Sequence, residues 1–380
     1  MKMNLPTGGM HTQILELLPI YEKTKNLRIS LVVKYTEYRP ISNKVDICTI
    51  YKFKNSKLNT VYFFLKSFYE IIKINKRNPI SIININSYYF NILSPLLIRL
   101  LFKIPLFIKP PTNFETHKEE EFMLKPRSLL NKIAFYGWMV ILQHFISKRK
   151  GIYFQAINNK IYRDFYTMGF DKENFIRLPN GISTNKFEGI KRLHKGEVHF
   201  GFIGRLLKSK NVERLLRVFL NYISEYPEDK LFIYGTGPEE IFLRDFIHEN
   251  KVGNNIFYMG FEKDKEKIYS NLDVLIHPSF GEGFPNVILE ALCAQAFIIA
   301  SDVTGNRDIV HHGVTGLLFN PKDDEDLLKQ LIFYKENPRR IPEMLQNAKI
   351  DVAKKYDIEK IAGKLLNFLQ RRINAELCEN

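Results

Sequence analysis

The sequence has little cysteine and no long hydrophobic run. Its 380 residues include only three cysteines, Cys48, Cys293 and Cys378, which are widely separated. An odd number at this spacing excludes a disulfide framework and a Cys-x-x-Cys metal motif, and it fits a reducing compartment. The longest apolar candidate, residues 133–146, is 14 residues long, whereas a membrane-spanning helix needs about 20. Since the N-terminus also has no signal-peptide pattern, we expect a cytoplasmic protein that does not span a membrane.

Acidic residues are scarce in the first half of the chain. Up to residue 180 there are 28 lysines and arginines against 12 aspartates and glutamates, a net charge of +16, whereas the remainder has 28 against 29. A basic half fits an anionic lipid surface, an anionic acceptor or nucleic acid. Because no helix-turn-helix, zinc-finger or RNA-recognition signature is present, we expect no nucleic acid partner and favour an anionic membrane surface.

The composition is that of a soluble globular protein, with 45% hydrophobic and 26% charged residues, and the length suits two or three domains. Apolar runs alternate with amphipathic stretches at the intervals of strand–helix units, which predicts an α/β protein with parallel sheets. In the second half we expect strands at residues 198–203, 230–234, 256–259, 273–277, 297–300 and 316–319. In the first half we expect strands at 1–5, 27–33, 80–86, 104–108 and 152–156, and helices at 12–22 and 61–74.

Residues 125–150 predict a further helix with a wide apolar stripe and basic residues at both ends, among them Lys125, Arg127 and Lys150. Such a helix can lie on a membrane surface. It can equally cover a Rossmann-like sheet as a core helix. Both interpretations stay open from the sequence.

Two glutamates, Glu282 and Glu290, stand eight positions apart in the stretch GEGFPNVILEA. The glycines free the loop backbone after an apolar strand, and Pro285 suits the start of a helix. A helix N-terminus presents unpaired N–H groups to an anion, so a phosphate is expected near Asn286 and Val287. The carboxylates can accept hydrogen bonds from hydroxyl groups. A nucleotide sugar supplies both the phosphate and the hydroxyls.

This stretch resembles the Glu-x7-Glu signature of the retaining glycosyltransferases of family 4 (glycosyl transferases group 1), which have the GT-B fold. The other motifs that carry the resemblance are Gly8-Gly9, Gly204-Arg205 with Lys210, Gly235-Thr-Gly237 and Pro179-Asn-Gly181. The sequence departs from the family in its short first strand, in Asn86 where histidine is common, and in Ser183 where aspartate is common.

The resemblance implies an α/β protein of two facing Rossmann-like domains with a cleft between them. An acceptor-binding domain is expected at 1–180 and a nucleotide-sugar-binding domain at 181–355. A C-terminal helix at 356–380 is expected to return to the first domain.

The resemblance also implies roles for individual residues. Arg205 and Lys210 would neutralise the leaving diphosphate. The planar guanidinium of Arg205 can form two parallel hydrogen bonds, and the ammonium of Lys210 acts as a compact positive charge. Glu290 would accept both ribose hydroxyls, and Glu282 would hold a hydroxyl of the sugar. The candidate catalytic residues are Glu282, Arg205, Lys210 and His117, the last in a loop suited to the acceptor. The residues expected to bind the donor are Gly8, Gly9, Gly204, Arg205, Lys210, Gly235, Gly237, Glu282, Gly283, Phe284, Asn286, Val287 and Glu290.

The implied activity is retaining transfer of a hexose from a nucleoside diphosphate sugar to a hydroxyl of a glycan or lipid-linked acceptor. No metal and no further cofactor is expected, because basic side chains would take the role of a divalent ion. The products would be cell-surface polysaccharide, lipopolysaccharide or glycolipid, made on the inner face of the cell membrane by a peripheral protein. The alternatives are a nucleotide-sugar epimerase, an inverting GT-B enzyme, and a non-enzymatic membrane-surface binding protein.

Overall fold

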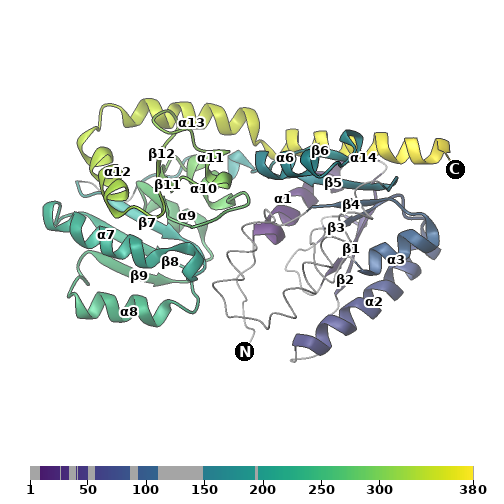
Figure 1. Cartoon of the computed structure of the whole chain (residues 1–380), viewed down its shortest axis with the longest axis horizontal. Helices are drawn as coiled ribbons and strands as arrows, with labels where there is room; N and C mark the ends of the chain where they lie inside the picture. The colour runs from purple at the N-terminus through teal and green to yellow at the C-terminus, as the bar shows by residue number, and fades with distance from the viewer. Residues whose placement is uncertain are drawn as a thin grey trace. The chain divides into compact units, whose positions relative to one another are not determined.

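The structure is a computed structural model that describes residues 9–25, 27–33, 40, 42–49, 56–85, 93–109, 149–192 and 196–379. The chain divides into two compact units (Figure 1). The C-terminal unit is formed mainly by Ile182–Asp357, and the N-terminal unit by Thr7–Asn113, Pro126–Gly181 and Ile358–Asn380. Each unit contains parallel β-sheet and helices, so the expected α/β fold class is confirmed. No helix among the described residues is long and apolar enough to cross a membrane.

The C-terminal unit is built on a six-stranded parallel sheet with the order β12-β11-β10-β7-β8-β9. The strands are β7 (His199–Ile203), β8 (Lys230–Tyr234), β9 (Ile256–Gly260), β10 (Val274–His277), β11 (Phe297–Ser301) and β12 (Leu317–Phe319). All six were expected from the sequence, and their ends differ from the expected ones by one residue at most. Their apolar runs are nearly continuous because a parallel sheet is buried on both faces.

The strand order of this sheet reverses between β7 and β10. From β7 the chain proceeds outward through β8 to β9, and it then returns to the other side of β7 to add β10, β11 and β12. Open α/β sheets bind ligands outside the carboxyl ends of the strands at such a reversal. The loops after β7 and β10 are therefore the first place to look for a site.

The helices of this unit are amphipathic and cover the sheet (Figure 1). Helix α7 (Val212–Glu225) buries Leu215, Leu216, Phe219 and Tyr222, which recur on one face at helical spacing. It packs against α12 (Asp324–Glu336), and both share a core with the strand residues Phe200, Phe202 and Ile299. The other helices are α8 (Glu240–Glu249), α9 (Lys265–Ser270), α10 (Asn286–Cys293), α11 (Thr304–Arg307) and α13 (Ile341–Lys355), with the short 3-10 helices η3 (Thr184–Phe187) and η4 (Lys208–Lys210).

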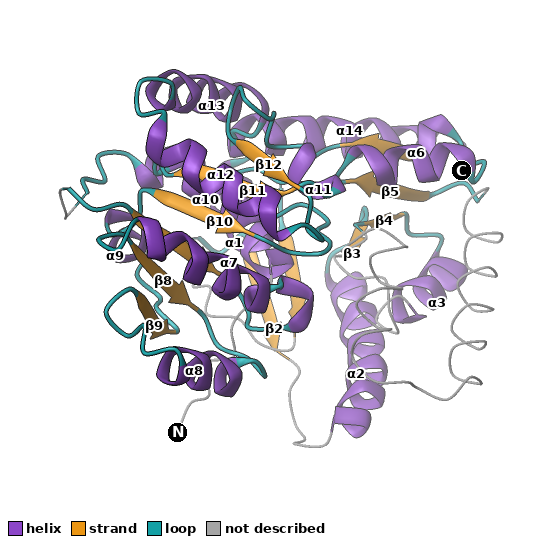
Figure 2. Ribbon diagram, turned by 60° about the vertical axis from the view of Figure 1, so that its left-hand side comes forward, coloured by secondary structure: helices purple, strands orange, loops and turns teal. Residues whose placement is uncertain are grey.

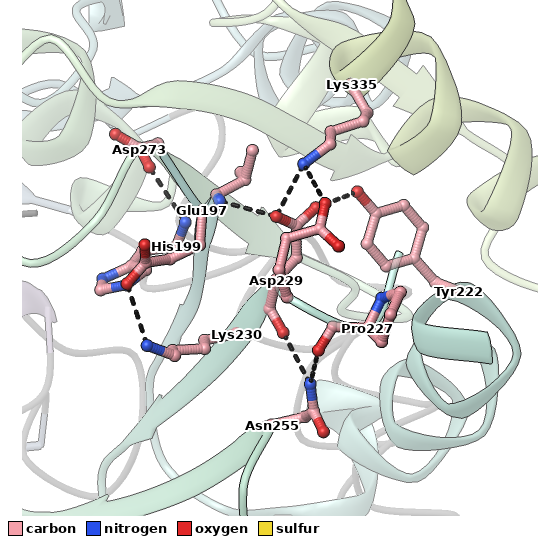
Figure 3. A network of polar contacts seen from close by, with 11 residues as sticks. Glu197, His199, Tyr222, Pro227, Asp229, Lys230, Asn255, Asp273 and Lys335 are labelled. Carbon is pink, nitrogen blue, oxygen red and sulfur yellow. Dashed lines mark hydrogen bonds and ion pairs between the residues drawn. The ribbon is translucent and has the colours of Figure 1, made fainter. Parts of the chain in front are cut away.

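A saturated polar network lies at the amino ends of β7 and β8 (Figure 3). The fully buried carboxylate of Asp229 accepts hydrogen bonds from the backbone N–H of Val198 at 2.7 Å, the Tyr222 hydroxyl at 2.7 Å and the Lys335 ammonium at 2.8 Å. A buried charge is tolerated only with such partners. This network therefore links the strands at the amino edge of the sheet, opposite to its carboxyl edge.

The N-terminal unit has a four-stranded parallel sheet with the order β3-β4-β5-β6 and a separate parallel pair, β1-β2. The strands are β1 (Ile29–Val33), β2 (Val45–Thr49), β3 (Ile83–Ile85), β4 (Leu106–Ile108), β5 (Ile152–Ala156) and β6 (Phe175–Arg177). The helices are α1 (Gly9–Lys23), α2 (Ser56–Arg77), α3 (Leu93–Phe102), α6 (Asn159–Thr167), the 3-10 helix η2 (Lys172–Asn174) and α14 (Ile358–Glu379). Figure 2 shows α2 and α3 side by side, in agreement with their contacts. The expected strand at 1–5 and most of the expected helix at 125–150 lie outside the described residues.

The last helix, α14, belongs to the core of the N-terminal unit. Its residues Ile361 and Leu365 are buried against Phe107 of β4 and Tyr153 of β5. The Phe368 ring adds an edge contact with Tyr153, at a centroid distance of 6.1 Å. The apolar side chains of α14 are therefore part of the core of this unit.

Candidate functional site

The loops that follow β7 and β8 meet at the carboxyl edge of the six-stranded sheet, and two glycines permit the contact. Gly235 has a φ of +133°, and a Cβ there would lie 1.8 Å from the carbonyl oxygen of Gly204. A Cβ at Gly237 would lie 2.3 Å from the carbonyl oxygen of Leu206. Real atoms cannot approach so closely, so these positions need glycine for packing, whatever they bind. Gly204, Gly235 and Gly237 were all predicted from the sequence to bind the donor, and this stays a prediction.

Lys210 and Glu282 meet across the point where the strand order reverses. Lys210 ends η4 in the loop after β7, and Glu282 lies in the loop after β10. The Lys210 Nζ is 2.5 Å from the Glu282 Oε1. A backbone hydrogen bond of 2.9 Å from the Phe280 N–H to the Ser209 carbonyl joins the same two loops. Two residues that were predicted separately from the sequence thus form one partly buried ion pair.

His277, the last residue of β10, completes the group. Its Nε2 lies 2.8 Å from the same Oε1 of Glu282, and its side chain is buried. From the sequence, His277 was predicted only as the end of a strand. Its place as a polar residue at the end of an otherwise apolar strand, just before the loop that contains Glu282, is the signal that could have identified it.

The surroundings of Glu282 decide its charge. Burial alone would raise the pKa of this carboxyl, but the neighbouring Lys210 and His277 outweigh burial and hold the pKa well below its usual range. Charged neighbours and hydrogen bonds to the ionised form act in this direction. Glu282 is therefore a carboxylate throughout the physiological range, so it accepts hydrogen bonds and does not donate them.

Glu290 is held in a similar way, one turn into α10. Its Oε2 accepts hydrogen bonds from the Lys265 Nζ at 2.8 Å and from the Tyr269 hydroxyl at 3.0 Å. Burial, together with this carboxylate, raises the pKa of Tyr269 well above its usual value, so the phenol remains a donor. Neither Lys265 nor Tyr269 was singled out from the sequence, because no local pattern relates them to Glu290.

Both glutamates share one property: each uses a single oxygen for its protein partners. Within the described residues, Oε2 of Glu282 and Oε1 of Glu290 have no hydrogen-bond partner. A carboxylate that is anchored through one oxygen presents the other in a fixed place. The arrangement can therefore accept hydrogen bonds from two sets of ligand hydroxyls.

The remaining expected residues are placed as follows. Arg205 is exposed and forms no ion pair within the described residues. Helix α10 begins after Pro285, whose side chain makes no cap hydrogen bond, and Asn286 and Val287 are half-buried in its first turn. Phe284 is buried, with its ring in an edge contact with Tyr356 at a centroid distance of 5.6 Å.

The last of the residues predicted for the site are Gly283 and three residues of the first half of the chain. Gly283 is buried beneath α11, since a Cβ on Gly305 would lie 2.8 Å from its carbonyl oxygen. Gly9 is the first residue of α1 in the N-terminal unit. Gly8 and His117 lie outside the described residues. No cluster of three metal-ligating side chains occurs in the part of the chain that the structure describes.

Comparison with known proteins gives relatives in sequence. A family profile described as "Glycosyl transferases group 1" matches residues 183–374, about half of the chain. The capsular polysaccharide biosynthesis glycosyltransferase CapM of Staphylococcus aureus is 26% identical over 46% of this chain and 50% of its own length. The alpha-monoglucosyldiacylglycerol synthase of Acholeplasma laidlawii is 28% identical over 50% of this chain and 51% of its own length. The chain thus spans about half the length of these relatives.

Comparison of folds gives a match over nearly the whole chain. The crystal structure of Alr3699/HepE from Anabaena, in complex with UDP and glucose, has a TM-score of 0.72 at 16% sequence identity. The match covers 96% of this chain and 96% of that one. At such low identity the likeness concerns the fold, and it confirms the expected GT-B class.

Proposed function

Because the chain belongs to the family of glycosyl transferases group 1, we propose that it is a retaining, metal-independent glycosyltransferase of family 4. It transfers a hexose from a nucleoside diphosphate sugar to a hydroxyl group of its acceptor. The observation that carries the proposal is the pair of carboxylates, Glu282 and Glu290, each anchored through one oxygen and open at the other. A sugar nucleotide offers hydroxyls at two separate places, on the hexose and on the ribose, and the two carboxylates can each accept hydrogen bonds from one of them.

The donor is bound by charge and by these hydroxyl contacts. Glu290 accepts from the ribose hydroxyls through Oε1, while Glu282 accepts from a hydroxyl of the hexose through Oε2. The diphosphate lies by Lys210, whose ammonium has two further N–H groups beyond the one directed at Glu282. Arg205 is exposed and has no ion-pair partner among the described residues. Its planar guanidinium donates hydrogen bonds to the same diphosphate.

These contacts act on the bond that breaks. As the bond between the sugar C1 and the diphosphate oxygen lengthens, negative charge grows on the diphosphate and positive charge on the sugar ring. Lys210 and Arg205 stabilise the negative charge on the diphosphate. The ionised Glu282 holds the sugar ring in position and places a negative charge near it. The acceptor oxygen bonds to C1 on the face that the diphosphate leaves, and the acceptor proton passes to a diphosphate oxygen. The configuration at C1 is therefore retained, and no enzymic nucleophile is needed.

The relatives support a class of product. One is named for capsular polysaccharide biosynthesis and another for synthesis of a glycosylated diacylglycerol. A glycan or a lipid-linked hydroxyl is therefore the acceptor class that we propose, with assembly on the cytoplasmic face of the cell membrane. The structural match in complex with UDP and glucose makes UDP-glucose the first donor to test.

An exposed apolar face on the N-terminal unit supports a peripheral location. On α3, the exposed residues are Leu97, Leu100, Leu101 and Phe102. The exposed Lys103 follows them. Apolar side chains beside basic ones are the pattern of a surface that rests on anionic lipid. The excess of basic residues in the first 180 positions acts in the same direction.

The test is binding followed by transfer. Nucleotide sugars that occupy the site at about 100 times their dissociation constant should add roughly 2.7 kcal/mol to stability, which thermal shift detects. The best donor, radiolabelled in its hexose, is then supplied with membrane lipid or glycan extracts. Labelled glycan or lipid with an unchanged anomeric configuration supports the proposal. An isomerised nucleotide sugar would show an epimerase, an inverted product an inverting enzyme, and no binding at all would remove the donor site.

A further inference from the structure

Among the charged groups of the described residues, His277 forms a hydrogen bond with Glu282 alone. Its Nε2 lies 2.8 Å from the Glu282 Oε1 and 3.4 Å from the Ser279 hydroxyl. Its Nδ1 is buried and has no hydrogen-bond partner among the described residues. A carboxylate only accepts hydrogen bonds, so Nε2 carries the proton that this contact requires. The ring therefore donates its Nε2 hydrogen to the Glu282 carboxylate.

The position of the histidine explains how such a contact is fixed. His277 is the last residue of β10, which pairs with β11 on one side and β7 on the other. Its side chain is only 3% exposed. A ring held by a central strand cannot follow the motions of a loop, whereas Lys210 reaches Glu282 through four rotatable methylene groups. The rigid partner of the carboxylate is thus the histidine.

We propose that His277 is a positioning residue, which holds Oε1 of Glu282 so that Oε2 stays in one place for a hydroxyl of the transferred sugar. The inference rests on the proposed function, because it assigns Glu282 to the sugar. With Lys210 alone, the carboxylate could rotate and exchange its two oxygens. The donor would still bind through its nucleotide, but the sugar would be misplaced for transfer.

Two substitutions at His277 separate positioning from packing. His277→Gln keeps an N–H donor of suitable reach, whereas His277→Leu fills a similar volume without a donor. We expect kcat for transfer from UDP-glucose, per folded molecule, to fall by roughly 10- to 100-fold in His277→Leu and by about 3-fold or less in His277→Gln. The affinity for UDP, measured by calorimetry, should stay within about 2-fold in both variants.

A purely structural role gives a different pattern. Both variants would then lower the melting temperature and the folded fraction, while kcat per folded molecule would not change. Equal kcat in His277→Leu and the wild-type protein would overturn the inference, and so would a glutamine variant no better than the leucine one. Ser279→Ala is the control for the longer contact, and it should leave kcat within about 2-fold.

A second measurement does not depend on activity. The protein labelled with 15N-histidine should show one imidazole signal that is absent in His277→Gln. The chemical shifts of that signal report which ring nitrogen is protonated. A protonated Nε2 supports the inference, and an unprotonated Nε2 overturns it even if transfer occurs. If the wild-type protein transfers no sugar, the proposed function fails, and this spectrum still decides whether His277 donates to Glu282.

Discussion

Lys210 and Glu282 are 72 positions apart in the chain, yet the Lys210 Nζ lies 2.5 Å from the Glu282 Oε1. The pair spans the reversal of strand order between β7 and β10, so a ligand that enters there meets both residues together. A basic residue that we assign to the diphosphate and an acidic residue that we assign to the sugar are therefore electrostatically coupled. Substitution of either residue changes the charge of the other's surroundings.

Lys210→Met should lower transfer by roughly 10²-fold, the scale of losing a preorganised charge contact. Because Lys210 also holds down the pKa of Glu282, the acid limb of the pH–rate profile should move to higher pH. Lys208→Met is the matched control: it removes an exposed lysine from the same short 3-10 helix. Initial rates between pH 4 and 9 check both variants. Equal losses in the two would show that only the general charge of the loop matters.

Glu282→Gln and Glu290→Gln should change the affinity for UDP in opposite directions. Glu282→Gln frees the Lys210 ammonium from its counter-charge, so UDP should bind about 2- to 5-fold more tightly while transfer falls by roughly 10-fold or more. Glu290→Gln removes the acceptor of the ribose hydroxyls, so UDP should bind roughly 10-fold or more weakly. Calorimetry and initial rates measure both effects. Weaker UDP binding in Glu282→Gln would contradict the assignment of that residue to the sugar.

The stability of the fold should report the charge of Glu282. Its folded-state pKa is lowered below the value of about 4.3 found in unfolded chains. Ionisation therefore adds stability that is fully present above about pH 4.5 and is lost as the pH falls through the folded-state pKa. The melting temperature of the wild-type protein should fall more steeply than that of Glu282→Gln between about pH 5 and 3, and the two curves should run parallel above about pH 5. Curves that stay parallel at lower pH too would show that the carboxyl is not stabilised in its charged form.

The polar network at the amino ends of the strands offers a matched pair of carboxylates. Asp229 is fully buried and Glu228 is 51% exposed, and both accept from the Lys335 ammonium. Asp229→Asn should cost about 2 to 4 kcal/mol of stability, because it disturbs a buried hydrogen-bonded charge. Glu228→Gln should cost about 0.5 kcal/mol or less. Urea unfolding measures both, and UDP affinity should stay normal since the network lies away from the site.

Vesicle binding should depend on the exposed face of α3. The wild-type protein should bind anionic vesicles better than neutral ones, and less so as salt rises from about 0.05 to 0.5 M. Leu101→Ser should weaken that binding. Ile350→Ser is the control, because Ile350 is similarly exposed, at 56% against 64%, but lies on α13 of the C-terminal unit. Equal effects of the two substitutions, or equal binding to both vesicle types, would contradict a specific lipid-facing surface.

The sequence by itself determined the strands of the C-terminal unit. Each of its six strands is an apolar run bounded by turn residues, and burial on both faces makes such runs recognisable without any partner. Strand β2 was missed, because its sequence VDICT is short and contains an aspartate; Asp46 is exposed, and Ile47 and Cys48 are only half-buried. Motif spacing likewise singled out Lys210, Glu282 and Glu290, since each stands in a short stretch whose residue types suit phosphates or hydroxyls.

Only the tertiary structure decided how these residues act together. Periodicity along the chain specifies strands and helices, but the order of strands in a sheet depends on the packing of segments that are far apart in sequence. That order places β10 beside β7, and with it His277 and Glu282 beside Lys210. The same holds for Glu290, whose partners Lys265 and Tyr269 come from the preceding helix. Which carboxylate oxygen is anchored and which is open depends on this packing, because Lys210 lies 72 positions from Glu282, and Lys265 and Tyr269 lie 25 and 21 positions from Glu290.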